Sequence, residues 1–220
     1  MTPRRAPAAL CWGVLAVVVA VSVATEFGRI LVLPADDGAP VGTRVVRFVS
    51  YFTIQSNVLV LALAATLARD PDRDDDRWRV VRLNALLGIT ITGLVYAIVL
   101  APTLHPEGLG WWTNAGLHYV APVVTLVLWI AFGPRPRITG ATVARALAWP
   151  VLWIGYTLAH GAVSGWYPYP FLDVSDLGYA VALRNLGFVV LLALLFLLAF
   201  RTVDRRLPAT APVSVETLSR

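Results

Sequence analysis

The chain has 220 residues, the length of one domain, and 58% of them are hydrophobic while only 14% are charged. A soluble domain carries roughly 25% charged residues, and the mean hydropathy of this chain is +0.71. The composition therefore argues against a soluble enzyme, a disordered regulator and a nucleic-acid-binding protein, since the charges behind the net +5 lie in loops between apolar segments. All eighteen basic residues are arginine, which is typical of a GC-rich, bacterial genome.

Six apolar segments are long enough to cross a bilayer, which takes about 20 residues of helix. In chain order they cover residues 8–33, 45–67, 80–100, 114–132, 142–163 and 177–200. A cleaved signal peptide is an alternative for the first segment, but its apolar run continues to Leu33, past the small residues of the candidate cleavage site. The sequence predicts an all-α integral membrane bundle of six transmembrane helices in residues 1–206 and a disordered cytoplasmic tail in residues 207–220.

The arginines predict the orientation of this bundle. They gather in the loops after the second and fourth segments and at the C-terminal end, whereas residues 101–113 and 164–176 contain none. Because positive residues favour the cytoplasmic side, we expect both termini in the cytoplasm and a multi-pass protein of the cell membrane; Arg44 and Arg47 go against this rule. The second arginine-free loop holds Trp166 in an aromatic, proline-rich run, which can form either a cavity lid or an aromatic belt at the membrane surface.

Polar side chains inside a membrane span are costly and usually face the interior of the bundle or a functional site. The second segment carries Arg47, Ser50, Thr53 and Asn57 at steps of three, three and four residues. An unbroken helix would place them on one face, with Ser56 beside it. Counted from an outer end at residue 45, Thr53 would lie about 12 Å deep.

Other segments also carry polar residues near their predicted outer ends. The fourth segment has Asn114 and His118 four residues apart, the fifth has Tyr156 and His160, and the sixth has Arg184. The inner halves of the segments consist almost entirely of Ala, Val, Leu and Ile. We therefore expect a shared polar cavity that opens toward the outside or the outer leaflet; hydrogen bonds that only hold helices together are the alternative.

Each of these polar residues also has a purely structural interpretation. A threonine in a membrane helix usually bonds to the carbonyl oxygen three or four residues back, and as a nucleophile it needs a neighbouring base. His118 and His160 can each be a general base, a metal or haem ligand, or a packing residue. Arg184 can pair with Glu26 or Asp173, or with a substrate carboxylate.

Three stretches of the sequence together resemble a known family. They are Tyr51-Phe52-Thr53 with Gln55 and Asn57, Asn114-x-Gly116-x-His118 followed by Pro122, and the run from Trp166 to Asp173. They resemble the androgen-induced and androgen-dependent family of multi-pass membrane threonine hydrolases, which cleave fatty acid esters of hydroxy fatty acids, and the chain looks like a distant prokaryotic six-helix relative. The resemblance implies that Thr53 is the nucleophile and His118 its base.

The sequence thus predicts a lipid-ester hydrolase that takes a membrane lipid or fatty-acyl ester from the outer leaflet. Asn57 or Ser56 would donate to the oxyanion, Asn114 would orient the base, and Arg184 would hold a fatty carboxylate. No metal and no cofactor is predicted, and the oligomeric state is left open.

Two other functions remain open at this point. The first is a membrane transporter or a small-solute or lipid-binding protein, in which the polar residues line a binding cavity. The second is electron transfer through a single haem held by His118 and His160.

Overall fold

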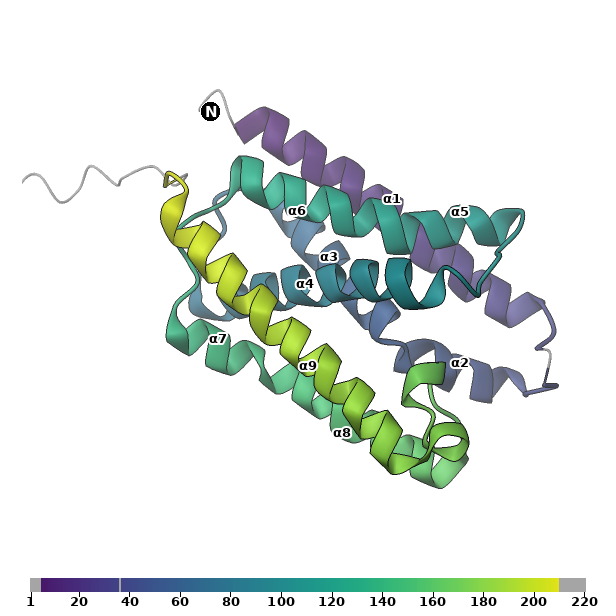
Figure 1. Ribbon diagram of the computed structural model, residues 1–220. Coiled ribbons are helices and arrows are strands. Elements are labelled where there is room, and N and C mark those ends of the chain that lie inside the picture. Colours follow the sequence, from purple (N-terminus) through teal and green to yellow (C-terminus); the bar gives the residue numbers. More distant parts are fainter. Residues whose placement is uncertain (1–4, 36, 210–220) are drawn as a thin grey trace, which may run out of the picture.

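The computed structural model describes residues 5–35 and 37–209, and every regular element in these ranges is a helix (Figure 1). Within these ranges six helices are long and apolar enough to cross a membrane, which confirms the predicted bundle. The chain is therefore an all-α, multi-pass membrane protein. Most of the predicted tail, residues 210–220, lies outside the described residues. The spans are Arg5–Val32, Phe52–Arg69, Asp76–Leu100, Leu109–Phe132, Gly140–Ser164 and Val174–Arg206.

The two ends of the described chain lie at the same end of the bundle, on the left in Figure 1. We call it the terminal end; it contains the first turn of α1 (Arg5–Val32) and the last turn of α9 (Val174–Arg206). The opposite end, called the site end, contains the connection after α1 and the connection 165–173 before α9. That the terminal end faces the cytoplasm remains the prediction drawn from the arginines.

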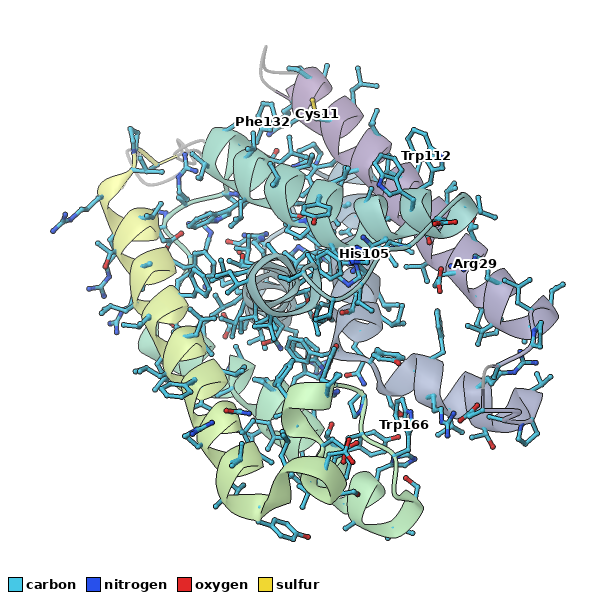
Figure 2. The ribbon with its side chains drawn as sticks, turned by 45° about the vertical axis from the view of Figure 1, so that its right-hand side comes forward. Cys11, Arg29, His105, Trp112, Phe132 and Trp166 are labelled. Atoms are coloured by element: carbon cyan, nitrogen blue, oxygen red, sulfur yellow. The ribbon has the colours of Figure 1, made fainter. Side chains whose placement is uncertain are left out.

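Helix α4 (Asp76–Val95) runs through the centre, and Figure 2 looks almost along its axis with the other helices around it. Every residue from 82 to 92 is buried. Small residues permit this close packing, because an added Cβ at Gly88 would lie 2.7 Å from Ser56 Oγ and one at Gly93 would lie 2.7 Å from Pro122. The remaining polar and apolar side chains of the site are arranged around this helix.

The second predicted span is broken, which corrects the expectation of one continuous helix. Helix α2 (Val41–Ser50) ends before Tyr51, whose φ of −64° and ψ of 126° are extended, and α3 (Phe52–Arg69) begins after it. In an unbroken helix the Ser50 carbonyl oxygen would accept the N–H of Ile54. It accepts the indole N–H of Trp153 instead, at 2.9 Å, and Ile54 bonds to Tyr51. The predicted single polar face of the second segment, and the depth of Thr53 counted along that face, therefore do not apply to this span.

The other elements are, in chain order, η1 (Tyr96–Leu100), α5 (Leu109–Ala115), η2 (Gly116–Val120), α6 (Ala121–Phe132), α7 (Gly140–Ala146), α8 (Ala148–Ser164) and η3 (Pro170–Leu172). Both η1 and η2 are π-helical turns, which often occur at functional sites. Helix α8 ends at Ser164 and is followed by Gly165, whose φ of 69° is left-handed. The Asp173 carboxylate accepts the N–H of Ser175 and so caps α9.

A buried polar network lies at the terminal end, where the sequence predicts almost only apolar side chains in the spans. Asp204, which is 1% exposed, accepts the backbone N–H groups of Arg137 at 2.7 Å and Ile138 at 2.8 Å. Arg82 is also buried and donates to the carbonyl oxygen of Arg73 at 2.7 Å. These bonds tie the last turn of α9 and the start of α4 to the connections beside them.

Replacing Asp204 with alanine should therefore lower the free energy of unfolding by about 3 kcal/mol, because two buried N–H groups lose a charged acceptor. Denaturant unfolding of the purified protein in detergent micelles measures the change. Asp176→Ala, which removes an exposed carboxylate near the other end of the same span, is the matched control. Equal stabilities of the two variants would contradict the anchoring role of Asp204.

Candidate active site

Thr53 lies in the first turn of α3 and is 8% exposed. Its backbone N–H has no helical acceptor, since α3 begins one residue earlier, and donates to the hydroxyl of Tyr169 at 3.1 Å. The Thr53 hydroxyl is 3.5 Å from Nε2 of His118 and 3.3 Å from the Tyr169 hydroxyl. The threonine hydroxyl therefore contacts residues of two other segments, in the way a nucleophile with a neighbouring base requires.

His118 lies in η2, and its own helix orients the imidazole. Nδ1 is 3.2 Å from the backbone carbonyl oxygen of Asn114, which can only accept. We therefore assign the ring proton to Nδ1, so that Nε2 offers its lone pair to the Thr53 hydroxyl. The imidazole stacks on the Tyr96 ring, with 4.0 Å between the ring centroids. The Asn114 side chain supports this stack, because its amide donates to the Tyr96 hydroxyl at 2.7 Å.

Tyr169 belongs to the connection between α8 and α9 and was not among the candidates from the sequence. Its ring is buried and packs edge-on against Tyr51 and in parallel with Phe171. This burial raises the pKa of Tyr169 to about 12, although hydrogen bonds with Thr53 oppose the shift. The phenol is therefore protonated at neutral pH and can donate a hydrogen bond at the site.

Thr53 and Tyr169 both line an apolar pocket, which has a volume of about 840 Å³ including its open side. Helices α4, α8 and α9 supply most of its lining, which contains no charged residue among those described. On α9 the lining extends from Leu186 to Leu194, about 12 Å at 1.5 Å per residue. The pocket thus suits an extended hydrocarbon chain, and Thr53 forms part of its wall.

Asn57 and Ser56, the predicted oxyanion donors, are fully buried between helices. The Asn57 amide donates to the carbonyl oxygens of Thr53 at 2.9 Å and Leu117 at 3.2 Å. Ser56 Oγ faces Gly88 of α4. Neither side chain lines the pocket, so Asn57 joins α3 to η2 and an oxyanion donor has to come from elsewhere.

Tyr156, His160 and Trp166 form an aromatic cluster beside α2 at the site end, where Figure 2 shows the labelled Trp166. The His160 ring lies 5.4 Å from Tyr156 and 5.8 Å from Trp166 between centroids, and Arg47 lies over the Trp166 ring. His160 thus contacts this cluster while His118 contacts Thr53. The placement of the two histidines in different clusters gives no support to a shared haem.

Arg184 does not line the pocket; it is exposed on α9 and donates to the side chain of Asn185 at 3.3 Å. Its two candidate protein partners are engaged elsewhere. Glu26 bonds to Arg29 at 2.7 Å, and Asp173 caps α9. The structure therefore does not bring Arg184 to Thr53.

Gly161 of α8 supports the connection that carries Tyr169, since a Cβ at this glycine would lie 2.1 Å from the Tyr167 ring. Gly161→Ala should displace Tyr167 and reduce the thermal stability of the protein, by the several degrees that an overpacked core costs. Gly155→Ala is the matched control, because a Cβ there meets nothing within 4 Å on the same helix. Equal melting temperatures of the two variants would show that the Tyr167 ring moves aside without loss of stability.

Comparison of the chain with protein-family models, with curated proteins and with solved structures gave no match. The site is therefore interpreted from its own geometry.

Proposed function

We propose that the protein is a membrane lipid-ester hydrolase in which Thr53 is the nucleophile and His118 is the general base. The observation that carries the proposal is the distance of 3.5 Å between the hydroxyl of Thr53, which lines an apolar pocket, and Nε2 of His118. A distance of 3.5 Å is long for a hydrogen bond, but such bonds often tighten when the substrate binds.

In the proposed reaction Thr53 Oγ1 attacks the ester carbonyl carbon while its proton passes to His118 Nε2. The Asn114 carbonyl oxygen holds the Nδ1 proton and stabilises the imidazolium. His118 then returns the proton to the alkoxide oxygen of the leaving group. The alcohol departs, and the acyl group remains bound to Thr53 as an ester. A water molecule, deprotonated by His118, attacks this ester and releases the fatty acid, which restores both residues.

The pocket favours a substrate with a long apolar acyl chain. Its lining is apolar except for four hydroxyl-bearing side chains, so it offers no charged group to a polar substrate; the four are Thr53, Thr92, Tyr96 and Tyr169. Such a substrate would reach the site from the bilayer. These features agree with the resemblance to the androgen-induced and androgen-dependent family, of which we propose the chain is a prokaryotic relative in the cell membrane.

A fluorophosphonate probe tests the proposal, because its phosphorus reacts with activated hydroxyl groups. Mass spectrometry of the labelled, detergent-purified protein should locate the adduct on Thr53. The Thr53→Ala variant should not be labelled, and His118→Ala should be labelled far more slowly. Thr103→Ala, which removes an exposed loop hydroxyl, should be labelled like the wild type.

Labelling of Thr53→Ala at the wild-type rate, or an absence of adduct on folded wild type, would contradict the hydrolase. The apolar pocket would then favour a lipid-binding or transport function, which retention of a fatty acid without turnover would reveal.

A further inference from the structure

The Tyr169 hydroxyl lies 3.3 Å from Thr53 Oγ1, the proposed nucleophile. Attack on an ester turns the carbonyl oxygen into an oxyanion, and a donor fixed at that place can be the largest single contribution to the rate. The backbone N–H of the nucleophile often provides it. Here that N–H donates to the Tyr169 oxygen at 3.1 Å and is therefore already engaged.

The bonds around this hydroxyl determine what its proton can do. The phenol oxygen accepts the Thr53 N–H at 3.1 Å, and Thr53 Oγ1 lies 3.3 Å away. Because we assign the Thr53 hydroxyl proton to the contact with His118 Nε2, Oγ1 accepts the phenol proton. When Oγ1 forms its bond to the carbonyl carbon, it becomes a poor acceptor, and the oxyanion on the same carbon is the nearest strong one. A hydrogen bond received by the phenol oxygen also polarises its O–H group and strengthens its donation.

We propose that Tyr169 is a catalytic residue, the hydroxyl of which donates to the oxyanion formed when Thr53 attacks a lipid ester; this inference rests on the proposed hydrolase function. The alternative donors predicted from the sequence are engaged elsewhere or face another helix, since the Asn57 amide bonds to two carbonyl oxygens. Tyr169 also lines the pocket, as an oxyanion donor must. The break at Tyr51 makes the arrangement possible, because an unbroken helix would take the Thr53 N–H into its own ladder.

The test is the hydrolysis of a fatty-acyl p-nitrophenyl ester by detergent-purified variants. Tyr169→Phe should lower kcat about 10²- to 10³-fold, the loss found when one oxyanion donor is removed. KM should stay within a factor of about two, because the donor acts only in the transition state. Tyr179→Phe, which removes a hydroxyl from a tyrosine that is 60% exposed on α9, should hydrolyse the ester like the wild type.

A second set of variants guards against a purely structural effect of the buried ring. Fluorotyrosines placed at position 169 keep the ring and its hydroxyl but make the phenol a stronger donor, so kcat should be retained or should rise with ring acidity while the melting temperature stays constant. An unchanged kcat in Tyr169→Phe, or a kcat in the fluorotyrosine variants that falls as ring acidity rises, overturns the inference. If the wild type does not hydrolyse the ester, both the proposed function and the role of Tyr169 fail. If the wild type is active and Tyr169→Phe has the same kcat, only the role of Tyr169 fails.

Discussion

Thr53→Ala and His118→Ala should each reduce kcat for ester hydrolysis by ~10⁴-fold or more, and the double variant should be no slower than the single ones. The effects are not additive because the two residues act as a unit: the imidazole has no proton to accept without the threonine, and the threonine is not activated without the imidazole. Initial rates with a fatty-acyl p-nitrophenyl ester in micelles measure the three losses.

The third histidine supplies the control for this series. His105 lies in the exposed connection after η1, as the label in Figure 2 shows, so His105→Ala should retain the wild-type rate. A double variant slower than the single ones by the product of their losses would show that Thr53 and His118 act independently. The nucleophile–base assignment would then be wrong.

Ala193→Trp should lower kcat/KM for long-chain esters by about 100-fold, since misplacement of a substrate by about 1 Å can have that effect. Ala193 lines the apolar pocket on α9, one residue before Leu194, where the lining on this helix ends. An indole there would fill the space that a long acyl chain needs but leave the region around Thr53 open. Esters of acetate or butyrate should therefore be hydrolysed at the wild-type rate, and a series of acyl lengths locates the change.

A matched substitution separates this effect from a general disturbance of α9. Ala199→Trp adds the same indole at an exposed position six residues further along the helix, outside the pocket. It should leave the dependence on acyl length unchanged. Equal effects of the two substitutions, or a loss at all acyl lengths in Ala193→Trp, would contradict the placement of the acyl chain in this pocket.

The hydropathy of the sequence predicts the six spans, because each apolar segment is long enough for a bilayer by itself. The break at Tyr51 could not be predicted in this way. It depends on the indole of Trp153, which lies about a hundred residues further along the chain and takes the carbonyl oxygen of Ser50. The assumption of an unbroken helix therefore gave a wrong polar face, although Thr53 and Asn57 do share the first turns of α3.

The proximity of Thr53 and His118 follows from features that the sequence contains, namely two polar positions at the same end of neighbouring spans. Tyr169 could not be singled out, because Tyr167 and Tyr169 each precede a proline in the same aromatic run. Only the packing of the connection against Tyr51 and Phe171 brings one of these hydroxyls to the site. The exposed position of Arg184 could not be predicted for a related reason, since the sequence does not show which side of α9 faces the pocket.

Because α4 lies at the centre of the bundle, it is surrounded by lipid when it is inserted and by protein once the bundle has assembled. In the most apolar part of its span 61% of the residues are buried inside the protein, against 17% for the span of α9. Helices of a membrane protein are first inserted singly and then associate, and α4 precedes α6, α8 and α9 along the chain. The mean hydropathy of 2.1 in that part of the span thus suits insertion into lipid, whereas Gly88 and Gly93 allow the close packing of the finished assembly, in which protein surrounds residues 82–92.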